Sequence, residues 1–267
     1  MNCSAKIRPT RVAIRYRRAT YITCLAAFGL SAAGATYAQG RAELEDAASR
    51  AQYAFLTRDT RALEEVLAEV SETSFQSNLA PLVSYQLAYG YWTLAQLNSQ
   101  RGGAARAAAA KAAKTCVEQA KGAVRQDARF AEAHAVQAIC EDKPHATIAI
   151  QQPGDGECDR NRALQTALNL APKNPRVKFV AALCTRPAQA EAQVRLWQEV
   201  VASFDAAVGP NSAVVDWGHA EALTMLAQAL LTAEQPVAAR DAVERALVIA
   251  PDFDTAQAVL QLIAANR

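Results

Sequence analysis

The sequence predicts an all-α fold built from antiparallel helical hairpins. Three observations lead to this prediction. Apolar and small residues recur at spacings of three and four, the period of one face of an α-helix. Prolines stand between and after the helical runs, where a helix cannot continue. Similar stretches also recur: AARDAVERALVIAPDF, from Ala238 to Phe253, has counterparts that begin at Cys116 and at Asn161.

The N-terminal residues 1–38 have the features of a secretory signal peptide. Six basic residues and no acidic one precede an apolar stretch of about fourteen residues, TCLAAFGLSAAGAT. This stretch is shorter than the roughly 20 residues that a membrane span needs. Thr36 and Ala38 are small enough for signal peptidase, so we expect cleavage before Gln39, export to the periplasm or the exterior, and no membrane span in the mature chain. A retained membrane anchor is the alternative.

Removal of the signal peptide changes the charge of the chain. The full sequence has 28 Lys and Arg against 26 Asp and Glu, and the first 38 residues contain six of the basic ones and none of the acidic ones. The mature chain, residues 39–267, therefore has a net charge of −4. Nucleic-acid binding proteins gather Lys and Arg on one face, so we expect no nucleic-acid partner. The mature chain is long enough for one domain or a short solenoid.

Several helical runs follow along the mature chain. Residues 41–69 contain two helical periods, EDAASRAQYAFL and RALEEVLAEV. The next run, SYQLAYGYWTLAQL, has Gly90 among aromatic residues and is expected to pair with the Ala-rich run 104–125. AEAHAVQA, after Phe130, is expected to form the first helix of a further hairpin. Residues 161–172 then resemble the second helix of a hairpin, and residues 175–183 begin the first helix of the next hairpin.

Aromatic residues are concentrated at helical spacing in the second of these runs. They are Tyr85, Tyr89, Tyr91 and Trp92. Such a stripe is more typical of a core than of a binding groove.

Residues 141–157 interrupt the helical pattern. This stretch, EDKPHATIAIQQPGDGE, contains two prolines and two glycines that a helix would not accommodate. We expect an ordered insertion loop held at its ends by cysteines. Long loops in compact domains are often functional, and a packed cover over a gap is the alternative.

The clearest repeat unit covers residues 220–253. Its pattern is Leu223-x2-Leu226-Ala227-x2-Leu230, followed by Ala239-x3-Val243-x2-Ala246-x4-Pro251. Pro236 suits the first turn of the second helix. The small residues would let two helices approach closely. This unit resembles a tetratricopeptide repeat, with Leu and Val in place of that family's bulky aromatics, and the other units match it only in part.

The resemblance implies a right-handed α-solenoid of stacked hairpins. The first helix of each unit would line a concave side that binds an extended peptide or a partner protein. A second copy of the chain is another expected partner. By analogy with such repeats, we expect these groove residues: Glu132, Arg176, Phe179, Glu221, Thr224 and Gln228.

Four cysteines remain after the signal peptide is removed. An even number in an exported protein predicts disulfides. Residues at equal distances from the turn of an antiparallel hairpin lie opposite each other, and two pairs have their midpoints in predicted turns. This geometry favours Cys116–Cys140 and Cys158–Cys184. A bridge from Cys140 to Cys158 that closes the insertion loop is the alternative.

The sequence shows no motif typical of catalysis. It contains no C-x-x-C pair, no G-x-S-x-G and no Gly-rich phosphate loop. A zinc site from Cys140, His145 and Cys158 lacks a convincing fourth ligand. His134 and His219, at the starts of first helices, are interpreted as structural. We therefore expect binding without catalysis, metal or cofactor; an enzyme or thiol-dependent factor that uses residues 141–157 and the flanking cysteines is the alternative.

Overall fold

The computed structural model describes residues 38–103, 105–142, 157–185, 189–207 and 217–265. The chain divides into two compact units, Met1–Glu43 and Leu44–Arg267. In the first unit the described residues, 38–43, are helical. Of the signal peptide predicted for residues 1–38, all but residue 38 lies outside the described residues, and so do residues 143–156 of the insertion loop predicted for residues 141–157.

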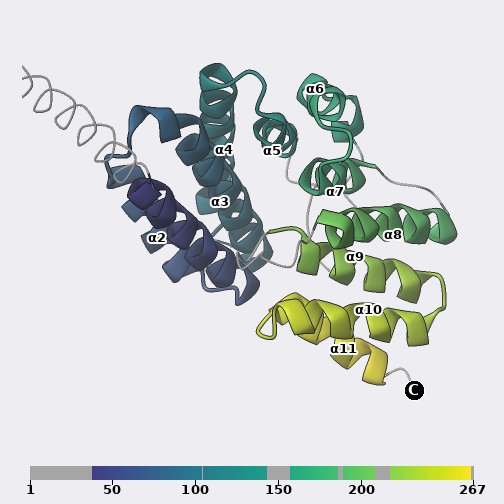
Figure 1. Ribbon diagram of the computed structural model, residues 1–267. Coiled ribbons are helices and arrows are strands. Elements are labelled where there is room, and N and C mark those ends of the chain that lie inside the picture. Colours follow the sequence, from purple (N-terminus) through teal and green to yellow (C-terminus); the bar gives the residue numbers. More distant parts are fainter. Residues whose placement is uncertain (1–37, 104, 143–156, 186–188, 208–216, 266–267) are drawn as a thin grey trace, which may run out of the picture. The chain divides into compact units, whose positions relative to one another are not determined.

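The second unit is all-α throughout its described residues (Figure 1). Residues 44–56 are helical and lead into the helices that follow. These are α2 (Thr60–Glu72), α3 (Ala80–Arg101), α4 (Ala105–Gln126), α5 (Ala131–Glu141), α6 (Arg162–Leu170), α7 (Pro175–Cys184), α8 (Ala190–Ala207), α9 (His219–Thr232), α10 (Pro236–Ile249) and α11 (Asp254–Ala265). Two short 3-10 helices, η1 (Ser77–Leu79) and η2 (Glu157–Arg160), precede α3 and α6.

Helices that follow each other in the chain pack together (Figure 1). The pairs are α3 with α4, α5 with α6, α7 with α8, and α9 with α10. The second helix of each pair also contacts the first helix of the next pair. We call α3, α5, α7 and α9 the first helices; α5 contacts both α3 and α7, and α9 contacts α11. Contacts between successive units are the defining feature of a helical-repeat arrangement.

The hairpin of α9 and α10 coincides with the unit predicted over residues 220–253. Ala227 of α9 and Ala239 and Ala246 of α10 are fully buried, as expected for small residues at packed positions. Pro236 is the first residue of α10, where its missing N–H costs no intrahelical hydrogen bond. Pro251 follows the end of α10, as predicted.

Two disulfides each join elements of successive hairpins. Cys116 of α4 is bonded to Cys140 of α5, with Cα atoms 5.5 Å apart. Cys158 of η2 is bonded to Cys184 of α7, with Cα atoms 5.0 Å apart. The favoured pairing is confirmed, and the alternative bridge from Cys140 to Cys158 is wrong. The position of both pairs on either side of a turn explains the outcome.

The two disulfides also indicate the kind of cellular compartment in which the protein is found. Disulfides persist in oxidising environments and are rare in the reducing cytosol, so the two bonds are consistent with an oxidising, extracytoplasmic compartment. Within the described ranges, no helix is both long enough and apolar enough to cross a bilayer.

Candidate functional site

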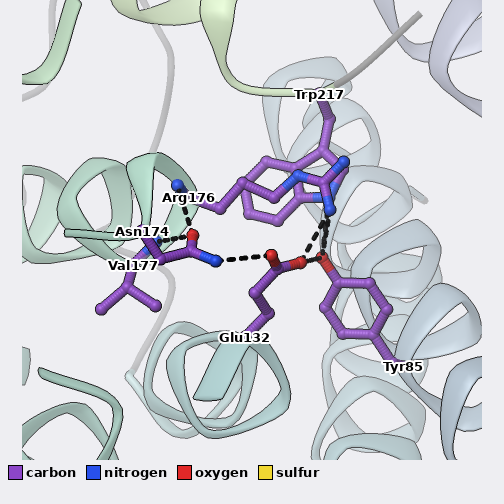
Figure 2. Close-up of polar contacts among 6 residues, drawn as sticks. All are labelled: Tyr85, Glu132, Asn174, Arg176, Val177 and Trp217. Atoms are coloured by element: carbon purple, nitrogen blue, oxygen red, sulfur yellow. Dashed lines mark hydrogen bonds and ion pairs between the residues drawn. The ribbon is translucent and has the colours of Figure 1, made fainter. Parts of the chain in front are cut away.

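Side chains from successive first helices meet in one polar and aromatic cluster (Figure 2). We call it the first-helix cluster and define it as Tyr85 of α3, Glu132 of α5, Asn174 and Arg176 at the start of α7, and Trp217 just before α9. Its members come from four successive hairpins or their boundaries, so the cluster joins segments up to 132 residues apart in the chain.

The Glu132 carboxylate lies at the centre of the cluster. Arg176 Nη1 donates to Glu132 Oε2 at 2.7 Å, and Asn174 Nδ2 donates to Oε1 at 2.8 Å. Tyr85 also donates to Oε2, at 2.7 Å. Burial alone would raise the pKa of Glu132, but Arg176 and the other donors outweigh it and hold this pKa below its ordinary value. Glu132 is therefore an anion paired with a cation.

The Tyr85 hydroxyl connects this ion pair to the aromatic part of the cluster. It donates to Glu132, and it accepts from Trp217 Nε1 at 3.0 Å and from Arg176 Nη1 at 3.4 Å (Figure 2). Tyr85 is buried, and burial raises the pKa of its hydroxyl well above the ordinary value. The hydroxyl thus keeps its proton and serves as donor and acceptor together.

Asn174 has two tasks, because it caps α7 as well as bonding Glu132. Its Oδ1 accepts from the backbone N–H groups of Arg176 and Val177 at 2.9 and 3.2 Å. Asparagine is a favoured helix cap, and the proline that follows it suits the first helical position. With its oxygen fixed by the cap, the amide nitrogen points at Glu132 (Figure 2).

The Trp217 indole packs among side chains from α3 and α7. Its ring stacks on Tyr89 of α3, with centroids 4.2 Å apart, and meets Phe179 of α7 edge-on at 6.0 Å. The Arg176 guanidinium carbon lies 5.3 Å from the indole centroid, within range of a cation–π interaction. Trp217 is buried, so its bonds to Tyr85 and Arg176 hold the first helices in register.

A second buried group adjoins the cluster through Tyr89. Glu221 accepts from Gln52 Nε2 at 2.5 Å and from the Gly218 backbone N–H at 2.9 Å. Tyr89 OH donates to Gln52 Oε1 at 3.2 Å and lies 3.4 Å from Glu221 Oε1. Glu221 has no exposed surface. Burial raises the pKa of its carboxyl above the ordinary value despite these donors.

The structure brings four of the six predicted groove residues together. Glu132 and Arg176 are paired, Phe179 contacts Trp217, and Glu221 lies on the other side of Tyr89. Phe179 and Glu221 are buried by the chain itself, whereas the Glu132 and Arg176 side chains keep 18% and 21% of their surface exposed. The exposed edge of this ion pair is therefore a part of the cluster that solvent reaches.

The other two predicted residues lie farther along α9. Thr224 is buried, and its hydroxyl donates to the Ala220 carbonyl one turn earlier in the same helix. Gln228 is half-buried, and its backbone carbonyl accepts from the Thr232 hydroxyl. Neither belongs to the cluster, so a groove that unites all six residues remains a prediction.

Sequence reasoning missed three members of these networks. Asn174 stands before Pro175, a spacing that signals a helix cap and could have drawn attention to it. Trp217 precedes a glycine and the start of α9, but nothing local indicates that its ring packs against α3 and α7. Gln52 bonds a residue 169 positions away, and no local pattern encodes such a contact.

The described residues hold no group of three or more His, Cys, Asp or Glu side chains placed to bind a metal ion. Cys140 and Cys158, considered as zinc ligands, are both disulfide-bonded, and His145 lies outside the described residues. His134 Nε2 is 3.0 Å from the Ala128 carbonyl, which fits a structural role.

A scan against protein-family models and a search of curated proteins found no match to the chain. The structure shows the coarser feature, an all-α arrangement in which successive helices pack together over the described residues.

Proposed function

We propose that the chain is an exported interaction module of the tetratricopeptide type, a right-handed α-solenoid whose first helices bind a peptide or a partner protein. The observation that supports this most is the contact of α5 with both α3 and α7. This packing gathers side chains from three hairpins at one place, as a surface for an extended ligand requires. The disulfides and the predicted signal peptide support a periplasmic or secreted location.

In this proposal the partner binds at the exposed edge of the Glu132–Arg176 pair. The buried members of the cluster hold that edge in place and do not touch the partner. Arg129 and Lys173 are exposed and stand three residues before Glu132 and Arg176, in the turns before α5 and α7. Glu132 is already paired with Arg176. Asp127, in the same turn as Arg129, offsets one of the two additional cations, so the two turns together have a net charge of +1. An acidic segment of a partner protein is the ligand that this charge favours.

The thiol-dependent alternative receives less support. The two cysteines that flank residues 141–157 each form a bridge to a different cysteine. A thiol mechanism would first have to reduce one of these buried bridges.

The test is capture of partners by charge-reversed variants. The full chain is expressed with its own N-terminal sequence, purified from an oxidising compartment, immobilised and exposed to an envelope extract of its host. Arg129→Glu with Lys173→Glu reverses the charge at the proposed edge. Lys111→Glu with Lys114→Glu makes the same charge change on α4, a helix that contributes no member of the cluster.

Proteins retained by the wild type and the α4 variant, but lost from the Arg129 and Lys173 variant, would support the proposal. Retention of the same proteins by all three chains would contradict it. Sedimentation of the wild type alone separates binding of a second copy from binding of another protein.

A further inference from the structure

We propose that a cavity at the turn before α2 binds a phosphate-type oxyanion. The cavity has a volume of about 340 Å³, and its lining residues are Arg58, Asp59, Thr60, Arg61, Leu97 and Arg101. Arg58, Arg61 and Arg101 are all exposed, so the space is open to solvent, and it has room for inorganic phosphate or a small phosphate monoester. None of these residues belongs to the first-helix cluster, so this site is independent of the proposed partner surface.

Three arginines from two separate segments face this cavity. Arg58 and Arg61 flank the start of α2, and Arg101 is the last residue of α3. Arg101 Nη1 donates to the Thr60 hydroxyl at 2.8 Å, which fixes the guanidinium beside the first turn of α2. Guanidinium groups remain charged at all physiological pH values and match phosphate oxygens with two parallel N–H donors.

The charges around the cavity favour an anion, although two carboxylates oppose it. Asp59 lines the cavity, but its Oδ1 also accepts from the Ala62 backbone N–H at 3.0 Å and so caps α2. Arg61 Nε is bonded to Glu65 at 2.9 Å, which leaves the other guanidinium nitrogens of Arg61 for a ligand. Three guanidinium groups around one space suit a tetrahedral anion with three or more terminal oxygens better than a two-oxygen carboxylate.

The backbone at Arg58, in the wall of the cavity, has an unusual conformation. Arg58 has a φ of 58°, in the left-handed region that residues other than glycine rarely adopt. Glycine or asparagine would fit this turn with less steric cost. The turn nevertheless places an arginine at the wall of the cavity.

The test is calorimetric titration of the full chain with inorganic phosphate and, separately, with glycerol 3-phosphate. Ionic strength is held constant, so that screening of surface charges does not change. Arg58→Gln with Arg101→Gln is expected to weaken binding at least tenfold. Asp59→Asn keeps a cap that suits helix starts and removes the opposing charge, so binding should tighten at least threefold. Arg240→Gln is the control, because Arg240 is paired with Glu244 four residues on, as Arg61 is with Glu65.

Binding of either titrant with this ranking of variants would support the site, and preference between the two would distinguish free phosphate from a monoester. Equal binding by the wild type and the Arg58 and Arg101 variant would show an adventitious ion only and overturn the proposal. An Asp59→Asn variant that binds no more tightly than the wild type would overturn it as well, and circular dichroism of each variant confirms that it is folded.

Discussion

Glu221 is the third residue of α9, and its carboxylate joins the helix start to a distant part of the chain. One oxygen accepts from the Gly218 N–H, which caps the helix, and the other accepts from Gln52. A carboxylate near a helix N-terminus is favoured by the helix dipole. Full burial nevertheless penalises its charge, and the pKa of Glu221 is raised from 4.5. The side chain therefore makes stability depend on pH.

Glu221→Gln should remove that pH dependence. Because the folded state holds the proton more tightly than the unfolded state, the contribution of Glu221 to the free energy of unfolding falls as pH rises above 4.5. Glutamine does not titrate, and a flip of the Gln52 amide restores the hydrogen bond. The stability of the variant relative to the wild type should thus rise between pH 4 and pH 8, as measured by urea unfolding. A difference that is constant or falls over this range would contradict the assignment.

Gly218 is a second position where a single residue is important for stability, because an added Cβ atom would not fit there. Its φ is 105°, and a Cβ there would lie 2.6 Å from Phe204 Cζ. Gly218→Ala should lower the free energy of unfolding by about 3 kcal/mol, from left-handed strain and overpacking together. Gly122→Ala is the matched control, since its Cβ would meet Ser84 Oγ at an ordinary 3.6 Å inside α4. There a gain of about 0.5 kcal/mol is expected. Equal effects in thermal unfolding would refute this reasoning.

At the scale of elements, the two disulfides fix α5 and α7 to their neighbours. They close loops with sequence separations of 24 and 26 residues. Such loops predict a stabilisation of about 3.5 kcal/mol for each bridge. Cys116→Ala with Cys140→Ala, and Cys158→Ala with Cys184→Ala, should each lower the urea midpoint accordingly; alanine avoids a buried hydroxyl. Variants that unfold at the wild-type midpoint would show that the bridges do not constrain the unfolded chain.

The helices were predictable from the sequence where their apolar period is clear and a proline marks a boundary. The hairpin of α9 and α10 satisfies both conditions, and so does α7, which begins at Pro175. Sequence reasoning omitted α8, although its buried residues Val194, Trp197 and Val201 have helical spacing. It also omitted α11, the helix after Pro251.

The candidate site was less predictable than the helices. The repeat register placed Glu132 and Arg176 on successive first helices, and the two side chains form an ion pair. Burial of Phe179 and Glu221 was not foreseen, because their cover comes from Trp217 and Gln52. Those contacts join segments that are far apart in the chain. The helical spacing of apolar residues indicates only which face of a helix is buried, so it could not predict them.

At the scale of the second unit, the bond from Gln52 to Glu221 departs from a simple repeat array. In such an array each unit contacts only its neighbours, and stability is a sum of local terms. Here the helix at residues 44–56 bonds the start of α9, 169 residues later, and Tyr53 bonds Asp252, 199 residues later. These contacts should make the first and last hairpins unfold together.

Gln52→Ala tests this coupling. Loss of the donor leaves a buried carboxylate with fewer hydrogen bonds, at a cost of about 2 kcal/mol. Hydrogen exchange should then speed up at the start of α9 as well as in residues 44–56. Tyr53→Phe is the control, because Tyr53 is 57% exposed and its bond to Asp252 contributes little in water. Faster exchange confined to residues 44–56 would mean that the hairpins open independently, and that the first-helix cluster does not depend on the N-terminal helix.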